Sequence, residues 1–221
     1  QKKVINIYCV IQEVKSSKRD NEPRVRKELE VYSSNYSDHK IYGYSYAGEY
    51  FQREKKPSYK VSIHKSYREK GVIKKKQWAI CTMSYYDMVD FGADVQGCIN
   101  SKRLKAKIED MRISEDEFYR MVYDKLDPIY EAIMKEYKVT EEYKTHKKHQ
   151  DIIRKYIDDK KAFESKYGSN TYDYCYDVYG VLREPDMLKE IKRQYENSQK
   201  YYSSYYENFK SNYSNSNFSS Y

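Results

Sequence analysis

Tyrosine limits the kind of core that this chain can form. The sequence contains 29 tyrosines among its 221 residues, and only 39% of all residues are apolar even when tyrosine is counted. A chain of this length is able to bury a substantial core, so tyrosine rings must supply much of it. Each ring carries a hydroxyl that needs a hydrogen-bond partner or access to solvent. We therefore expect a thin core with polar edges.

The sequence favours an α+β fold in which strands come first and helices follow. Apolar and alternating segments fill the first ninety residues, beginning with the continuous apolar run VINIYCVIQEV at 4–14. After residue 92, apolar residues recur at helical spacing. We expect an antiparallel sheet of about five strands over 1–92, and a helical region over 93–195 that packs with it as one domain. The absence of strand–helix alternation argues against a parallel nucleotide-binding sheet.

The clearest strand signal is a hairpin formed by 58–68 and 72–83. Tyr59, Val61 and Ile63 alternate with polar residues, which is the period of a half-buried strand. Lys70-Gly71 suits a two-residue hairpin loop. The resulting register pairs Glu69 with Val72, Lys65 with Lys76, Ile63 with Trp78, and Val61 with Ile80.

Capping residues predict where the later helices begin and end. Ser114 begins a capping box ahead of a helix. Thr140 caps a long amphipathic stretch that runs to Tyr167 and stops at Gly168. A short helix is expected over 171–180, and another begins near Pro185.

The segment 196–221 is of low complexity and rich in serine, asparagine and tyrosine. Such a segment is typical of a tether that leads to a further domain or to a partner. Its aromatic residues recur every four positions, at Tyr201, Tyr205, Phe209 and Tyr213. This spacing fits one face of a helix, and it fits equally a disordered tail in which the spacing is accidental. We expect these side chains to contact the body of the protein or another chain.

The net charge of +8 favours an anionic partner, such as nucleic acid, an acidic protein or a phospholipid surface. The alternative is a lysine-rich codon bias, which would raise lysine, tyrosine, asparagine and isoleucine together. The charge is most concentrated in the hairpin between Lys60 and Lys76, where Glu69 is the single acid. A like-charge pair such as Lys65 and Lys76 costs stability unless water screens it or an anion lies between the two ammonium groups.

The hairpin is therefore our candidate site for nucleic acid or another anion, with a solvated hairpin end as the alternative. Its lysines and arginine would contact phosphates, and a flanking ring would stack on a base. The candidate residues are Lys65, Arg68, Lys70, Lys74, Lys75 and Lys76 as cations, with Tyr67 and Trp78 as stacking rings.

Two other groups of polar residues have simpler explanations. His146 and His149 lie three apart and could share a metal ion, but neighbouring lysines repel a cation and favour a solvated helix face. Asp87, Asp90 and Asp94 could form a carboxylate pair for acid–base chemistry. They follow a strand where a helix begins, so helix capping is the better interpretation.

Neither an enzyme nor a cofactor-binding protein is indicated. The sequence contains no phosphate-binding glycine loop, no dinucleotide fingerprint and no zinc-protease or hydrolase motif. Cys175 lies between Asp173 and Asp177, whose charges disfavour a thiolate nucleophile. We expect no catalytic residue, no metal and no cofactor.

The cysteines and the apolar segments indicate a reducing cytoplasm. Cys9, Cys81, Cys98 and Cys175 are widely spaced and predict neither a disulfide framework nor a zinc site. No apolar run approaches the length of a membrane span, and no signal peptide is visible. We expect no membrane association, and the oligomeric state stays open.

A series of segments resembles a family of J-domain-like proteins of low-GC Gram-positive bacteria and their mobile elements. The segments are VINIYCVIQEV, YGYSYAGEYF, YKVSIHKSYREKG, KKKQWAICTMSYYDMVDFG, EEYKTHKKHQDIIRKY and KYGSNTYDYCYDVYG, which together cover most of 3–180. The resemblance implies a β-then-helical region, a Ser/Tyr/Asn linker, and a small helical domain bearing His-Pro-Asp that stimulates a DnaK-type chaperone. His-Pro-Asp does not occur in this sequence, so no chaperone-contacting residue is carried over.

These observations predict a non-enzymatic module that recognises another macromolecule. The first hypothesis is a protein-binding adaptor, namely the targeting part of a J-domain-like co-chaperone that reaches a DnaK-type partner through a further domain. The alternative is a nucleic-acid-binding protein of a mobile element that uses the basic hairpin 60–76.

Overall fold

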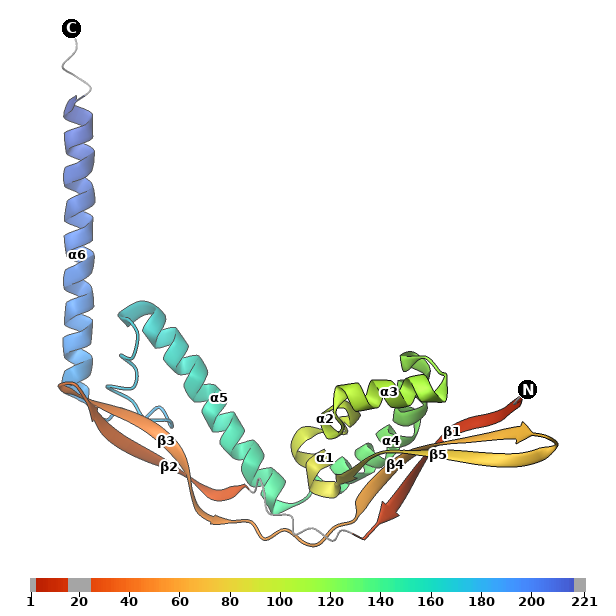
Figure 1. Ribbon diagram of the computed structural model, residues 1–221. Helices are drawn as coiled ribbons and strands as arrows, with labels where there is room; N and C mark the ends of the chain where they lie inside the picture. Colours follow the sequence, from red (N-terminus) through yellow and green to blue (C-terminus); the bar gives the residue numbers. More distant parts are fainter. Residues whose placement is uncertain (1–2, 16–24, 217–221) are drawn as a thin grey trace. The chain divides into compact units, whose positions relative to one another are not determined.

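The computed structural model describes residues 3–15 and 25–216, which form two compact units (Figure 1). Unit 1 comprises Gln1–Val25 and Tyr50–Lys144, and unit 2 comprises Arg26–Glu49 and Thr145–Tyr221. Strands occupy the N-terminal part of the chain and helices follow, which confirms the predicted α+β class. The five strands divide into a three-stranded sheet and a two-stranded sheet.

The three-stranded sheet belongs to unit 1 and is antiparallel throughout. It contains β1 (Lys3–Val14), β4 (Ser58–Glu69) and β5 (Val72–Ser84), with β4 in the middle. Lys70 and Gly71 join β4 to β5 with positive φ angles of 50° and 78°, as a type I′ turn requires. The predicted hairpin and its pairing of Ile63 with Trp78 are thus confirmed.

One predicted pairing in this hairpin is wrong by a single residue. Val61 faces Cys81 rather than Ile80, because the register shifts between Val61 and Ser62, and Ser62 then faces Ala79. The shift is a β-bulge, which places two residues of one strand opposite one residue of the other. Ile80 is buried and Cys81 is partly buried against the core.

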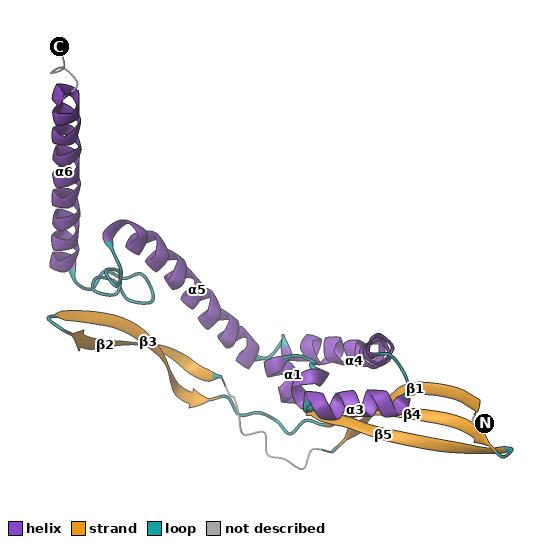
Figure 2. Ribbon diagram, turned by 45° about the horizontal axis from the view of Figure 1, so that its top comes forward, coloured by secondary structure: helices purple, strands orange, loops and turns teal. Residues whose placement is uncertain are grey.

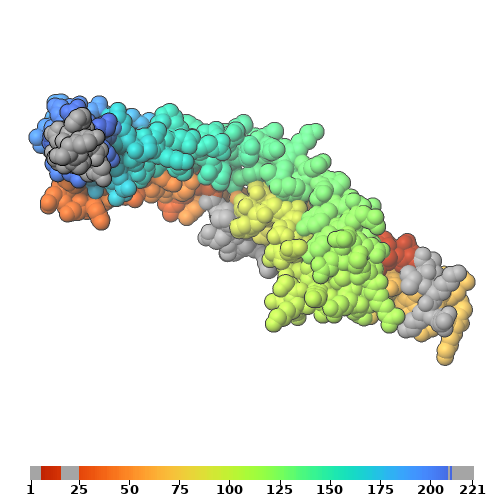
Figure 3. Space-filling view, turned by 90° about the horizontal axis from the view of Figure 1, so that it is seen from above, coloured from red at the N-terminus to blue at the C-terminus, as the bar shows by residue number. Residues whose placement is uncertain are grey.

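The helices that follow β5 in unit 1 lie on one face of this sheet (Figure 2). They are α1 (Tyr85–Phe91), α2 (Val95–Cys98), α3 (Ser101–Met111) and α4 (Glu115–Tyr137). Ser114 caps α4 as predicted, since its hydroxyl accepts a hydrogen bond from the backbone N–H of Glu117. Viewed from the helix side, the tip of the β4–β5 hairpin extends beyond the helices (Figure 3). Val72 and Ile73 at this tip are accordingly exposed.

The core of unit 1 is mainly aliphatic, contrary to the expected tyrosine-built core. Val61 and Ile63 of β4 pack with Met88 of α1 and with Phe118 and Leu126 of α4, and all five are fully buried. Tyr85 and Tyr86 are the tyrosines among the buried residues of this cluster. Branched aliphatic side chains and methionine therefore suffice to bury this face of the sheet.

Unit 2 does use tyrosine as its main core residue. It contains β2 (Arg26–Tyr36), β3 (His39–Tyr50), α5 (Glu141–Tyr167) and α6 (Pro185–Ser216), and α5 begins within unit 1. Tyr156, Tyr172 and Val178 are buried together. The ring centroids of Tyr156 and Tyr172 lie 5.8 Å apart, and the Tyr156 hydroxyl donates to Asp173 at 2.5 Å. A carboxylate thus satisfies the hydroxyl that the buried Tyr156 ring brings.

The two units do not follow the predicted division at residue 92. Each unit contains strands and helices, because the β2–β3 hairpin is inserted between β1 and β4 and packs its apolar side chains with those of α5. Thr140 caps α5, and α5 ends before Gly168 as predicted. The helix expected over 171–180 is a series of turns.

Asp177 explains why that segment turns instead of forming a helix. Its fully buried carboxylate accepts hydrogen bonds from the backbone N–H groups of Tyr179, at 2.9 Å, and Val181, at 3.0 Å. Arg183 donates to the same carboxylate at 2.8 Å. An aspartate that binds the backbone two and four residues ahead stabilises a turn in place of helical hydrogen bonds.

The first part of α6 packs on unit 2, and the two described tyrosines of the predicted aromatic stripe are exposed. Ile191 is buried, whereas Tyr201 and Tyr205 lie on the helix with 68% and 58% of their surface exposed. Among the described residues, their ring contacts are with the adjacent Tyr202 and Tyr206, and the expected contact with the body of the protein or with another chain stays a prediction. The side chains of Phe209 and Tyr213 lie outside the described residues.

We predict that Asp177→Ala lowers the free energy of unfolding by about 3 kcal/mol, because two backbone N–H groups lose their buried acceptor. Urea denaturation followed by circular dichroism measures this loss. The matched control is Asp158→Ala on the exposed surface of α5, which should change stability by less than about 0.5 kcal/mol. Equal effects of the two substitutions would contradict the role assigned to Asp177.

Candidate functional site

The basic residues of the β4–β5 hairpin divide between the two faces of the sheet. Side chains alternate along a strand, and the buried pair Ile63 and Trp78 marks the face that the helices cover. Lys65, Lys74 and Lys76 share that covered face. Lys60, Arg68 and Lys75 share the opposite face, which no helix of unit 1 covers among the described residues (Figure 2).

The basic residues of the covered face are bound within the protein. Lys65 donates to the backbone carbonyl of Met111 at 2.7 Å, and Lys76 donates to the carboxylate of Asp110 at 2.8 Å. These acceptors form the C-terminal end of α3, where the helix dipole favours cations. Lys65 and Lys76 do face each other as predicted. The anion that offsets the repulsion between the two ammonium groups is the carboxylate of Asp110, a group of the protein itself.

Trp78 is held at the same place and cannot stack on a ligand. Its ring is 6% exposed, and its indole N–H donates to Asp110 at 2.7 Å. Hydrogen bonds from Lys76 and Trp78 lower the pKa of the Asp110 carboxyl below its ordinary value. Lys74 forms a 2.6 Å ion pair with Glu69. The structure therefore places Lys65, Lys74, Lys76 and Trp78, all predicted site residues, in structural contacts.

The other predicted residues lie at the turn or along the two strands. Arg68, Lys70 and Lys75 are exposed, with Lys70 in the turn, while Tyr67 is half-buried opposite Lys74. Arg68 and Lys75 form no ion pair among the side chains that the structure describes. The same holds for Lys60, which lies near the start of β4.

We define the uncovered face by the register of the three strands. It consists of Asn6, Tyr8, Val10 and Gln12 of β1, Lys60, Ser62, His64, Ser66 and Arg68 of β4, and Ile73, Lys75, Gln77, Ala79 and Thr82 of β5. None of these residues is aspartate or glutamate. The charged residues of this face, Lys60, Arg68 and Lys75, are all cations, so its formal charge is positive.

Two rings lie at the centre of the uncovered face. Tyr8 and His64 face each other across β1 and β4, and their ring centroids are 5.7 Å apart at an interplanar angle of 46°. Ser62 lies 3.1 Å from the Nε2 atom of His64 and also donates to the carbonyl of Val10. These contacts fix the His64 ring on the sheet. Sequence reasoning missed Tyr8 and His64, because their pairing depends on a β1–β4 register that no local pattern determines.

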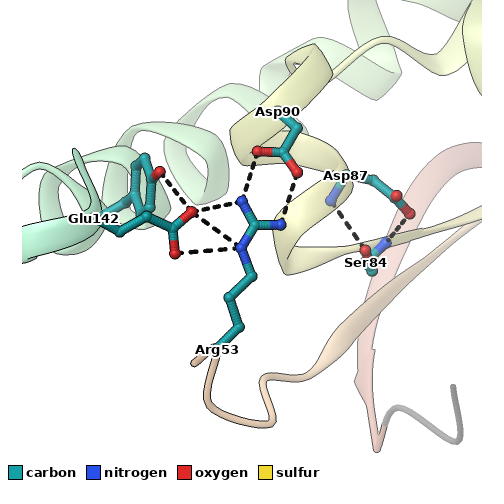
Figure 4. A network of polar contacts seen from close by, with 6 residues as sticks. Arg53, Ser84, Asp87, Asp90 and Glu142 are labelled. Atoms are coloured by element: carbon teal, nitrogen blue, oxygen red, sulfur yellow. Dashed lines mark hydrogen bonds and ion pairs between the residues drawn. The ribbon is translucent and has the colours of Figure 1, made fainter. Parts of the chain in front are cut away.

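A second polar cluster in unit 1 centres on Arg53, whose side chain is 1% exposed (Figure 4). Two guanidinium nitrogens donate to the two carboxylate oxygens of Asp90 at 2.8 and 2.9 Å. Glu142 accepts from the same guanidinium at 2.6 Å and from the hydroxyl of Tyr137 at 3.0 Å. The guanidinium also lies 4.4 Å from the centroid of the Tyr86 ring.

The Arg53 cluster is a structural ion network. Burial alone would lower the pKa of the guanidinium, but the hydrogen bonds to Asp90 and Glu142 outweigh burial and raise it. Both carboxylates that face the guanidinium are bound to it. The network instead connects the segment before β4 to α1 and to the first turn of α5.

Breaking this network should be among the most destabilising changes in unit 1. We expect Arg53→Ala to lower the free energy of unfolding by about 3–5 kcal/mol, because it leaves two buried carboxylates without a counterion. Arg53→Lys should recover only part of this loss, since an ammonium cannot bind Asp90 through two parallel hydrogen bonds. Denaturant titration measures both. Arg120→Ala, at an exposed position of α4, is the control, and a loss at Arg53 no larger than at Arg120 would refute the prediction.

The two histidines considered as metal ligands are not equivalent. His149 is buried against Tyr46, with ring centroids 5.7 Å apart, whereas His146 is exposed. Among the described residues, no group of three or more His, Cys, Asp or Glu side chains could hold a metal ion. The Nδ1 atom of His149 is buried and has no hydrogen-bond partner in the described part of the chain. Burial, with the charges of His146 and Lys148, lowers the pKa of His149 below its ordinary value.

The lowered pKa of His149 predicts a loss of stability in mild acid. The unfolded chain takes up a proton near pH 6.5, while the folded state resists protonation until the pH is lower. Stability is therefore full above pH ~6.5 and falls as the pH decreases through the window between the two pKa values. His149→Gln should remove this part of the pH dependence and His146→Gln should not. Thermal unfolding at a series of pH values tests this, and identical profiles for the two variants would exclude His149 as the cause.

The remaining candidates have structural roles. Asp87 forms a capping box with Ser84 at the start of α1 (Figure 4), and Asp94 caps α2, as predicted. Asp90, by contrast, binds Arg53. Burial raises the pKa of the Cys175 thiol to about 11, so the thiolate is disfavoured as predicted, although burial rather than neighbouring acids is the main cause.

Comparisons with protein-family models, with curated proteins and with solved structures found no match to this chain. Within the described residues, every helix is too short or too polar to cross a membrane. The uncovered face of unit 1 is the surface whose composition most clearly indicates a ligand.

Proposed function

We propose that this protein is a non-enzymatic nucleic-acid-binding module that uses the uncovered face of unit 1. The supporting observation is that Lys60, Arg68 and Lys75 share this face without any acidic residue on it. Contacts between such cations and phosphates supply most of the affinity of sequence-independent binding, because each contact releases condensed counterions.

The distribution of charge favours nucleic acid over an acidic protein or a phospholipid surface. Lys60 and Arg68 lie eight positions apart on β4, which corresponds to roughly 26 Å along a strand. Lys75 lies on the neighbouring strand, opposite Ser66. A polyanion with regularly repeated phosphates can contact cations spread along such a line, whereas one anionic side chain or one headgroup contacts them singly.

A protein-binding role is the second candidate, and α6 supports it. Tyr201, Tyr202, Tyr205 and Tyr206 are each more than half exposed. Tyrosine is enriched in protein interfaces, because it combines a large ring with a polar hydroxyl. In this alternative, α6 carries the contacts of an adaptor, as the resemblance to J-domain-like proteins with their DnaK-type partner suggests. The proposed compartment for either role is the reducing cytoplasm, in keeping with four free cysteines.

The salt dependence of binding tests the proposed function. For the full chain, we expect binding to a fluorescent oligonucleotide to weaken steeply with salt. The triple variant Lys60→Gln, Arg68→Gln, Lys75→Gln should lower the slope of log K against log salt by about 2–3, which corresponds to three lost phosphate contacts. Fluorescence anisotropy at several salt concentrations measures both quantities.

A matched control makes this test specific to the face. Lys102→Gln, Arg103→Gln, Lys105→Gln removes the same charges from exposed positions of α3, which lies on the covered side. This variant should bind almost as well as the parent protein. Equal weakening by the two triple variants would indicate attraction to net charge alone, and no binding at low salt would reject the proposed function.

A further inference from the structure

The uncovered face carries a feature that phosphate contacts alone do not explain. Tyr8 and His64 lie midway between Lys60 and Arg68, because His64 is four residues from each along β4 and Tyr8 is its partner on β1. The side chain of Tyr8 is 36% exposed even though it lies on a sheet. A ring pair that is available to solvent at the centre of a basic face suits a ligand with its own aromatic rings.

The surroundings of these rings hold one of them in place. Ser62 is fully buried on the sheet, and its hydroxyl lies 3.1 Å from Nε2 of His64 and donates to the carbonyl of Val10. Ala79, opposite Ser62, is small and exposed. A base that lies on this surface would therefore meet a ring that needs little reorganisation. Preorganised rings lose less conformational entropy on binding.

Amide side chains surround the ring pair on the same face. Gln77 lies opposite His64 on β5, Asn6 lies opposite Ser66, and Gln12 lies opposite Lys60, and all three amides are exposed. An amide group both donates and accepts hydrogen bonds, so it can pair with the edge of an unstacked base. The face thus presents cations for phosphates, rings for base planes and amides for base edges.

We propose that the uncovered face binds single-stranded nucleic acid, with one base stacked on the Tyr8–His64 pair and phosphates on Lys60, Arg68 and Lys75. This inference rests on the proposed function and specifies its ligand. In a duplex the base planes are already stacked on one another and cannot reach a ring on the protein. In a single strand every base has a free plane.

The test compares single-stranded and duplex oligonucleotides of the same mixed sequence, about 12 nucleotides long so that they span the face. We expect Tyr8→Ala and His64→Ala each to weaken single-strand binding by roughly tenfold. Both should leave duplex binding and the salt slope almost unchanged, because no phosphate contact is lost. Tyr8→Phe retains the ring and should bind as the parent protein does. Circular dichroism confirms that each variant is folded.

The outcomes separate this inference from the proposed function. If the Lys60, Arg68 and Lys75 variant loses binding but Tyr8→Ala weakens single-strand and duplex binding equally, the stacking inference is overturned and the proposed function stands. If neither form of nucleic acid binds at low salt, both fail. Parallel measurements with DNA and RNA of the same sequence show which sugar is accepted, and a loss for Tyr8→Phe as large as for Tyr8→Ala would also contradict stacking.

Discussion

The buried guanidinium of Arg53 is the interaction on which the arrangement of unit 1 depends. Arg53 lies where the chain returns from the β2–β3 hairpin to begin β4. Asp90 holds it to α1 and Glu142 holds it to the start of α5. Four residues later, the carbonyl of Pro57 accepts a hydrogen bond from the backbone N–H of Tyr85, at the start of α1. One side chain thus connects the segment before the central strand with the last turn of α1 and the first turn of α5.

The C-terminal end of α3 determines which cations of the hairpin remain available. Its Met111 carbonyl binds Lys65, and its Asp110 carboxylate binds Lys76. The lysines on the face of the hairpin that carries the core therefore bind acceptors within the protein. Its other side keeps Lys60, Arg68 and Lys75 without an ion pair among the described residues. The basic residues of 60–76 consequently serve stability on one face and, in our proposal, recognition on the other.

Features that depend on neighbouring residues could be predicted from the sequence, and features that depend on distant ones could not. The turn at Lys70-Gly71 and the caps at Ser114 and Thr140 follow from local chemistry and are confirmed. The bulge at Ile80 was missed because Ile80 and Cys81 are both apolar, so either could face Val61. For the candidate site, the basic hairpin was evident, but its division into two faces required the position of α3. The pairing of Tyr8 with His64 joins residues 56 positions apart in the sequence.

The insertion of β2 and β3 between β1 and β4 has a consequence for how the chain can be divided. Unit 1 is formed from two separate stretches, and so is unit 2. No single cleavage of the backbone can therefore release either unit intact, and a fragment that begins at residue 50 would lack β1, an edge strand of the three-stranded sheet. During synthesis, β1 can pair only after β4 has been made. Their pairing closes a long loop and therefore costs more conformational entropy than the pairing of adjacent strands. The chain therefore enters each unit twice.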